Sequence, residues 1–192
     1  LAAVKAACDL PLVADIHFDY KLAVESVFAG ADKIRINPGN IGADERVKAV
    51  ADCCKAKNVP IRIGVNSGSL NKEILNQYGG PIPQALAQSA LNEAKLLERY
   101  DFDNIIISVK SSDAKTTVEA NRILAQNCEY PLHLGVTEAG TEEMSSLKSA
   151  AAIGSLLLDG IGDTIRISIT GEPEREVIVG KNLLAALGMS NR

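Results

Sequence analysis

Three arginines occupy the same local setting at separate places in the sequence, each between two isoleucines. The triplets are Ile34-Arg35-Ile36, Ile61-Arg62-Ile63 and Ile165-Arg166-Ile167. Successive residues of a strand point to opposite faces, so the isoleucines of each triplet face one way and the arginine faces the other. Arginine is rarely buried without a partner, and its planar fork of donors matches phosphate oxygens. The repeated triplet therefore predicts a cationic face shared by three strands.

The same alternation carries polar residues toward the end of each predicted strand. The aligned positions are Asp15 and His17, Arg35 and Asn37, Arg62 and Asn66, Ser108 and Lys110, and Arg166 and Ser168. The cations on this face outnumber its acids, and like charges held close together are costly unless an anion compensates them. We therefore expect a small, phosphorylated substrate there. Three unrelated ion pairs with acids on adjacent strands remain the other interpretation.

Few residues are candidates for proton transfer. His17 and His133 are the only histidines, and His17 shares the polar face with Asp15. His133 lies earlier in its strand, where a structural role is expected. Glu138, in the segment GVTEAG, comes just after a strand and between small residues. A carboxylate in that position is a candidate proton donor or base.

Strand-like and helix-like patterns alternate from one end of the sequence to the other. Short segments rich in Ile and Val, bounded by Pro, Gly, Asp or Asn, predict strands at 12–16, 33–37, 60–65, 104–110, 131–136 and 164–169. Helical patterns cover 21–29, 44–57, 83–99, 114–127, 142–159 and 173–187. Thr141 and Pro173 are typical helix-start residues. The segment NPGNIGADE, which begins at Asn37, is expected to offer free backbone N–H groups before a helix, an arrangement that suits an anion, and an ordinary turn is the alternative.

Six successive βα units predict a parallel sheet covered by helices. A doubly wound sheet and a (β/α)8 barrel of the TIM type both fit this order. The barrel is favoured because no G-x-G-x-x-G turn occurs and because polar residues recur inside nearly every strand. The chain begins with a helical pattern, so we expect residues 1–192 to form an incomplete barrel that lacks about two βα units at its N-terminus.

Composition restricts the class of protein further. Of the 192 residues, 46% are hydrophobic and 23% are charged, and the net charge is −4. The acidic balance argues against a general nucleic-acid binder, and no apolar run approaches the roughly 18 residues of a membrane span. The four cysteines, Cys8, Cys53, Cys54 and Cys128, form no C-x-x-C pair. This favours a cytoplasmic protein with free thiols and no metal site built from them.

Six segments in this order resemble the 4-hydroxy-3-methylbut-2-enyl diphosphate synthase family. They are VADIHFDY, IRINPGNIG, IRIGVNSGSL, SVKSSD, LHLGVTEAG and GIGDTIRIS. The resemblance implies an oxidoreductase of isoprenoid biosynthesis by the methylerythritol phosphate pathway. Such an enzyme opens 2-C-methyl-D-erythritol 2,4-cyclodiphosphate reductively to hydroxymethylbutenyl diphosphate, with loss of water. It further implies a flavodoxin or ferredoxin as electron donor and a homodimer of the full-length protein.

The resemblance also implies roles for single residues. Substrate contacts fall on Arg35, Asn37, Arg62, Asn66, Lys110, Arg166 and Ser168. Glu138 matches the glutamate of the family's active site, and Asp15 and His17 match an active-site pair. The family carries a 4Fe-4S cluster on a C-terminal domain, and this chain ends at LGMSNR without a C-P-x-C run. No cluster is therefore expected on this chain, and no activity is expected from it alone.

Two other functions remain open from the residues. Lys110 beside three arginines is a plausible amine nucleophile for a Schiff-base aldolase that acts on a phosphorylated substrate. A non-catalytic domain that binds a phosphorylated metabolite would use the same cationic face.

Overall fold

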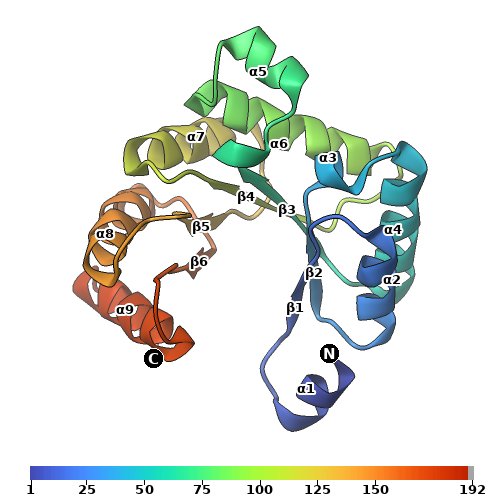
Figure 1. Ribbon diagram of the computed structural model, residues 1–192, viewed down its shortest axis with the longest axis horizontal. Coiled ribbons are helices and arrows are strands. Elements are labelled where there is room, and N and C mark those ends of the chain that lie inside the picture. Colours follow the sequence, from blue (N-terminus) through green and yellow to red (C-terminus); the bar gives the residue numbers. More distant parts are fainter. Residues whose placement is uncertain (190–192) are drawn as a thin grey trace. The chain divides into compact units, whose positions relative to one another are not determined.

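The structure is a computed structural model that describes residues 1–189. The chain divides into two compact units. Unit 1 comprises Leu1–Gly64 and Ala90–Ile107, and unit 2 comprises Val65–Ser89 and the chain from Ser108 onward. Strands and helices alternate through both units, as predicted (Figure 1).

Unit 1 contains the first three strands and the helices that follow them. Its elements are α1 (Ala2–Ala7), β1 (Val13–Asp15), α2 (Tyr20–Phe28), β2 (Lys33–Ile36), α3 (Pro38–Ile41), α4 (Asp44–Lys57) and the first part of β3 (Ile61–Asn66). The C-terminal part of α6 (Pro83–Glu98) and the start of β4 (Ile105–Lys110) complete it. Helices α2 and α4 pack side by side (Figure 1).

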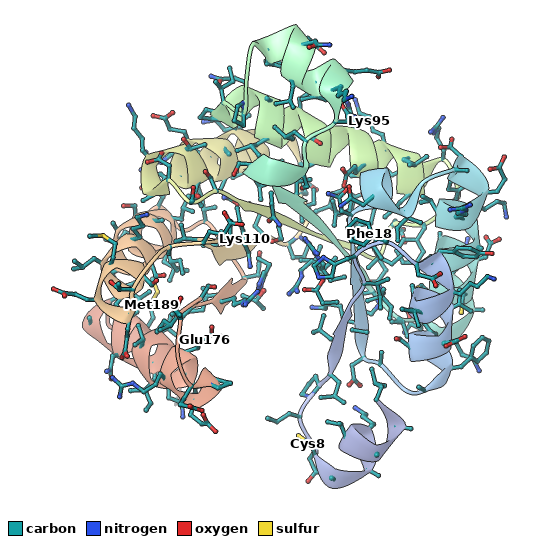
Figure 2. All side chains as sticks on the ribbon, in the orientation of Figure 1. Cys8, Phe18, Lys95, Lys110, Glu176 and Met189 are labelled. Carbon is teal, nitrogen blue, oxygen red and sulfur yellow. The ribbon has the colours of Figure 1, made fainter. Side chains whose placement is uncertain are left out.

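Unit 2 contains the remaining elements. They are η1 (Ser67–Ser69), α5 (Lys72–Tyr78), the start of α6, the end of β4, α7 (Ala114–Asn127), β5 (His133–Gly135), α8 (Glu142–Leu158), β6 (Thr164–Arg166) and α9 (Pro173–Ala186). Helix α8 packs against both α7 and α9. Figure 2 places the labelled Met189 beyond the end of α9.

Strand β1 pairs in parallel with β2, and β2 pairs in parallel with β3. One sheet has the order β1-β2-β3-β4, and β5 pairs with β6. Arg35 of β2 lies opposite Asp15 of β1 and opposite Arg62 of β3. The order contains no reversal, whereas a doubly wound sheet reverses its strand order near the middle. The sequential order therefore favours the barrel.

The core consists of aliphatic side chains on the strand faces that the isoleucine triplets predicted. Ile34, Ile36, Ile61 and Ile63 are completely buried, whereas Arg35 between the first two is only partly buried. Fully burying an aliphatic side chain contributes about 1.5–3 kcal/mol to folding. These isoleucines thus fix the buried faces of β2 and β3, and Arg35 and Arg62 are left on the opposite face. In the third triplet, Ile167 is buried but Ile165 is only partly buried.

Helix ends agree with their sequence signals. The Thr141 side chain accepts a hydrogen bond from the Met144 N–H at the start of α8, and Pro173 occupies the first turn of α9. The segment after Asn37 differs from the prediction. It forms α3, in which the N–H groups of Asn40 and Ile41 donate to the carbonyl of Asn37. The expectation of free N–H groups was therefore wrong for Asn40 and Ile41.

Within residues 1–189, no helix has both the length and the apolar character needed to cross a membrane.

Candidate functional site

The cationic face of unit 1 is a row of three aligned side chains on adjacent strands. Asp15, Arg35 and Arg62 share one register position on β1, β2 and β3. Arg35 Nη1 donates to Asp15 Oδ1 at 2.9 Å, and Arg35 Nη2 donates to the carbonyl of Gly64 at 3.0 Å. The Arg35 side chain is only 11% exposed. The guanidinium is therefore fixed between β1 and β3 before any ligand arrives.

Lys33 adds a cation that sequence reasoning missed. It lies two residues before Arg35 on β2, so it shares the same face and lies nearer the start of the strand. Burial lowers the pKa of its ammonium group, and the Arg62 charge lowers that pKa further. The isoleucine triplets predict only the arginines. The alternation of side chains along β2 also predicts that Lys33 lies on the same face as Arg35.

Glu93 is a second residue that sequence reasoning missed. It lies on α6 between the buried residues Ala90 and Ala94, and its Oε2 is buried without a hydrogen-bond partner. Burial raises the pKa of the Glu93 carboxyl to about 8, and the charge of Arg35 opposes that rise. An acid on the apolar stripe of a helix was the available signal.

The segment after β2 lies close to this acid. A side chain at Gly39 would come within 3.6 Å of Glu93 Oε1 and 3.2 Å of Asn37 Oδ1. Asn37, a predicted substrate contact, is 2% exposed and precedes α3. Glu93 thus helps to enclose the segment that carries Asn37.

The predicted pair of Asp15 and His17 lies at the end of β1. Their closest polar atoms, Asp15 Oδ1 and His17 Nε2, are 3.8 Å apart. The His17 side chain is 62% exposed, and the stronger partner of Asp15 is Arg35. Asp15 therefore orients Arg35, while His17 remains accessible to solvent.

In unit 2, Lys110 ends β4 and is almost fully buried (labelled in Figure 2). Its side chain extends toward Gly135 of β5. A Cβ at Gly135 would lie 3.0 Å from Lys110 Cε and 3.1 Å from Lys110 Nζ. Gly135 lies opposite Arg166 in the register of β5 and β6. The ammonium group is thus held close to the strand pair that carries Arg166.

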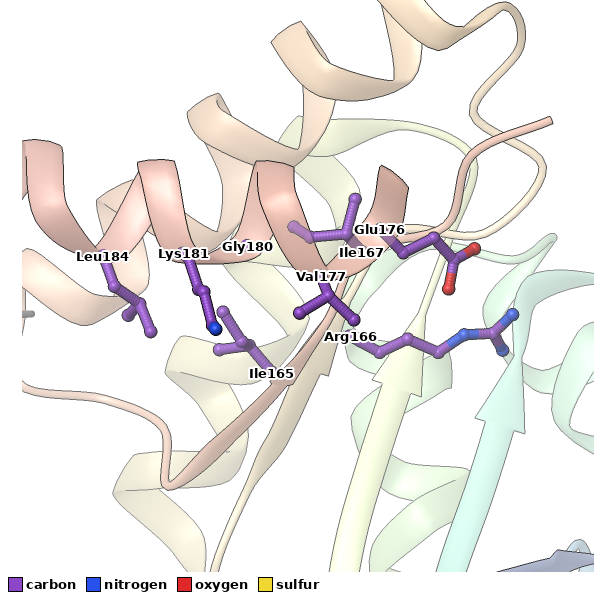
Figure 3. A pocket seen from close by; sticks show the side chains of 8 residues that line it. All are labelled: Ile165, Arg166, Ile167, Glu176, Val177, Gly180, Lys181 and Leu184. Atoms are coloured by element: carbon purple, nitrogen blue, oxygen red, sulfur yellow. The ribbon is translucent and has the colours of Figure 1, made fainter. Parts of the chain in front are cut away.

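Arg166 lies at the end of β6, beside a cavity of about 270 Å³ between β6 and α9 (Figure 3). The stem of Arg166 lines this cavity, and its guanidinium extends toward the same end as the Glu176 carboxylate (Figure 3). Ile165, Ile167, Val177 and Leu184 form much of the remaining wall. Lys181 also lines the cavity, but most of the lining is apolar, so we interpret the cavity as a packing gap beside β6. Ser168, two residues further on, is partly buried.

Glu138 has an uncommon backbone conformation. Its φ of 49° lies in the left-handed region, and the residue is exposed in the segment after β5. Neighbouring bonds hold that segment: the Thr137 N–H donates to the carbonyl of Ser111 at 3.2 Å, and Ser145 Oγ donates to the carbonyl of Gly140 at 3.0 Å. Residues held in this region cluster at functional sites. A fixed, accessible carboxylate is suited to proton transfer.

Two other polar residues of unit 2 have backbone or structural contacts. The Asn66 N–H donates to Ser69 Oγ, which in turn donates to the Asn66 carbonyl and fixes the chain after β3. His133 Nδ1 lies 2.8 Å from Thr164 Oγ1 across the β5–β6 pair and is buried. The expected structural role of His133 agrees with this contact. The grouping of Arg35, Arg62, Lys110 and Arg166 around one ligand involves both units and stays a prediction.

The cysteines do not fit an iron–sulfur cluster. Cys8 lies just after α1 (Figure 2), Cys53 and Cys54 are on α4, and Cys128 follows α7. Burial raises the pKa of Cys54 to about 12 and also raises the pKa of Cys53 and Cys128. Within residues 1–189, no three His, Cys, Asp or Glu side chains are grouped so that they could hold a metal ion.

Comparisons with known proteins identify the family. The family model of the GcpE TIM-barrel domain matches residues 1–181. The chain is 58% identical over 184 residues to the 4-hydroxy-3-methylbut-2-en-1-yl diphosphate synthase (flavodoxin) of Caldicellulosiruptor saccharolyticus, with 96% of this chain and 53% of that protein covered. It is 57% identical over 185 residues to the protein of the same name from Clostridium perfringens, with the same coverage of 96% and 53%. The chain thus spans about half the length of these relatives.

Solved structures share the fold at low sequence identity. A dihydropteroate synthase from Clostridium difficile has a TM-score of 0.60 and 15% identity, with 96% of this chain and 70% of that chain covered. A 2,3-dimethylmalate lyase has a TM-score of 0.55 and 14% identity, with 97% and 66% covered. These likenesses concern the fold alone. Together with the match to a TIM-barrel domain, they confirm the barrel and exclude the doubly wound sheet.

Proposed function

This chain belongs to the family of the GcpE TIM-barrel domain, and on that premise we propose that it is the substrate-binding barrel of a 4-hydroxy-3-methylbut-2-enyl diphosphate synthase. The proposed substrate is 2-C-methyl-D-erythritol 2,4-cyclodiphosphate. The reaction opens its ring with two electrons and two protons, forms 4-hydroxy-3-methylbut-2-enyl diphosphate and releases water. This step belongs to isoprenoid biosynthesis.

One observation supports the proposal above the others. Arg35 and Arg62 lie opposite one another on adjacent strands, on the face that the buried isoleucines leave free. Asp15 compensates the charge of Arg35, and the paired forks of Arg35 and Arg62 match the oxygens of a diphosphate, which would add negative charge beside two guanidinium groups that repel each other. Lys33 on the same face increases the positive charge. The names of the relatives, which are diphosphate synthases, support the proposal that the anion is a diphosphate.

The roles proposed for the side chains follow from their chemistry. The diphosphate binds Arg35, Arg62, Lys110 and Arg166 through charge-assisted hydrogen bonds, and Asn37, Asn66 and Ser168 add neutral contacts. Glu138 handles a proton of the reaction, because its carboxylate is accessible and held in an uncommon conformation. Asp15 orients Arg35, and His17 is proposed as the second member of the active-site pair.

The electron donor in this proposal is flavodoxin, which the names of the relatives carry, and ferredoxin is the alternative donor. When bound, a 4Fe-4S cluster supplies the electrons one at a time. Because Cys8, Cys53, Cys54 and Cys128 do not fit such a cluster, we assign no step to them and propose that its ligands come from a different domain. A homodimer is proposed for the full-length enzyme.

An anaerobic turnover assay tests the proposed function. The intact protein is supplied with the cyclodiphosphate and reduced flavodoxin, and the product is followed by mass spectrometry. We expect hydroxymethylbutenyl diphosphate to form only when the reductant is present. Its absence, together with a Lys110 adduct trapped by borohydride and a ketone phosphate, would instead support an aldolase.

A further inference from the structure

The backbone of β3 leaves the side-chain position at Gly64 empty, and the guanidinium of Arg35 fills that space. A Cβ built on Gly64 would lie 2.1 Å from Nε, 2.6 Å from Nη2 and 2.7 Å from Cζ of Arg35. Non-bonded heavy atoms prefer separations of about 3.5–4.0 Å. No side chain therefore fits at position 64 while Arg35 keeps its place.

The backbone conformation at position 64 does not require a glycine. Gly64 is absent from the glycines with positive φ, and it lies inside β3 between Ile63 and Val65, which have ordinary side chains. An interior glycine weakens a strand, because it has no side chain to pack and loses more conformational entropy on folding. The requirement at position 64 is therefore one of space, and a side chain from β2 occupies that space.

The position that Arg35 gains is fixed from two sides. Nη2 donates to the Gly64 carbonyl at 3.0 Å, and Nη1 donates to Asp15 Oδ1 at 2.9 Å. A guanidinium has five N–H donors, so these two bonds leave others for a ligand. A side chain that is ordered before binding loses less conformational entropy when the ligand arrives.

We propose that Gly64 is a positioning residue: its missing side chain lets Arg35 lie across β3 with its guanidinium held ready for a diphosphate. The identity of the ligand rests on the proposed function, whereas the dependence of Arg35 on the empty position at Gly64 does not. Alanine at position 64 displaces the guanidinium from the Gly64 carbonyl and leaves Asp15 as its remaining anchor.

A double-mutant cycle in the intact protein tests the inference, with inorganic pyrophosphate as the probe in calorimetry. We expect Gly64→Ala to weaken binding about tenfold or more, the scale of a lost hydrogen bond to a charged group. In the Arg35→Ala background, Gly64→Ala should weaken binding by less than about twofold, because the displaced group is already absent. Gly154→Ala is the matched control. Gly154 is also buried, but a Cβ there would meet Leu183 Cδ1 at an ordinary 3.8 Å.

If Gly64→Ala folds too poorly for calorimetry, the thermal unfolding midpoints of the single and double variants test the same inference. Overpacking should lower the unfolding midpoint by about 2–12 °C, and Arg35→Ala should restore most of that loss by vacating the space. The inference is overturned if Gly64→Ala binds pyrophosphate as the parent does, if its effect is as large without Arg35, or if the double variant stays as unstable as the single one. If Arg35→Ala binds pyrophosphate as the parent does, both this inference and the proposed anion site are overturned. A failure confined to Gly64→Ala overturns this inference alone.

Discussion

Both units place a cationic side chain over a glycine of another strand, but the two glycines are needed for different reasons. In unit 1, the three nearest neighbours of a Cβ at Gly64 are all atoms of the Arg35 side chain. In unit 2, the nearest neighbour of a Cβ at Gly135 is the backbone carbonyl oxygen of Arg166 at 2.8 Å, and Lys110 Cε and Nζ follow at 3.0 and 3.1 Å. The missing side chain of Gly64 leaves room for the Arg35 side chain. The missing side chain of Gly135 leaves room for the Lys110 side chain and also for the backbone of β6, with which β5 pairs.

This difference indicates which glycine substitution should mainly affect ligand binding and which should mainly affect folding. A requirement that comes from a side chain disappears when that side chain is removed, whereas one that comes from a neighbouring strand remains. In unit 1, a substitution at Gly64 should therefore alter ligand binding, and a second substitution at Arg35 should restore the stability that the first one costs. Unit 2 offers the proposed proton-transfer residue, Glu138, on a segment with its own backbone constraint. The predictions that follow test this division.

The largest expected effect belongs to unit 2. Glu138→Gln nearly preserves shape and removes an acid, so turnover with the cyclodiphosphate should fall about 100-fold or more while substrate affinity stays within a few-fold. Steady-state turnover and calorimetry on the same preparations provide the measurement. Glu143→Gln, also exposed and on α8, is the control and should keep parental turnover. Equal turnover in the two variants would remove Glu138 from the proposed chemistry.

The next effect concerns the stability of unit 2. Gly135→Ala should lower the free energy of unfolding by about 1–3 kcal/mol, the usual cost of overpacking. Adding Lys110→Ala should restore little of this loss, because the collision with the Arg166 carbonyl remains. Denaturant unfolding of the single and double variants measures both values. Full recovery in the double variant would show that the two glycines are equivalent after all.

The last effect, the smallest over any single pH unit, is the pH dependence of unit 1. The pKa of Glu93 rises from 4.5 to about 8 on folding, so the folded chain binds the extra proton between these values. The stability contributed by this group is complete below pH 4.5 and is lost as the pH rises toward 8, at no more than about 1.4 kcal/mol per pH unit.

Glu93→Gln removes that titration. The variant should gain stability relative to the parent as the pH is raised from about 5 to about 9, as measured by unfolding midpoints at each pH. Glu119→Gln, at a partly exposed position on α7, is the control. A difference between Glu93→Gln and the parent that does not change with pH would show that Glu93 is charged in the folded protein.

Most of the fold could be predicted from the sequence, because buried isoleucines alternate with polar residues and reveal both strand and face. Helices α4 and α7 were predicted with the observed bounds. Helices α3 and α5 were missed because Pro38, Gly39 and the polar residues near Asn71 are typical of turns. The buried side chains of Pro38 and Ile41 hold α3 in place, and such packing is set by tertiary structure.

The candidate site was predicted in part. Alternation along β2 and β3 placed Arg35 and Arg62 on one face, but no pattern within a strand reveals which residues of two strands lie opposite each other. The bond from Arg35 to Asp15 and the space above Gly64 depend on that register. Glu93 was missed for a related reason: helical periodicity identifies a buried face but not the arginine that lies near it.

Calorimetry with the cyclodiphosphate on Arg62→Lys, beside Glu138→Gln, tests the central claim most directly. Arg62→Lys keeps the charge but loses the fork, so binding should weaken by roughly 1.5–3 kcal/mol, or about tenfold to 150-fold, while Glu138→Gln binds within a few-fold of the parent. The opposite pattern, with parental binding by Arg62→Lys and no binding by Glu138→Gln, would contradict the assignment of the cationic strand face to the diphosphate.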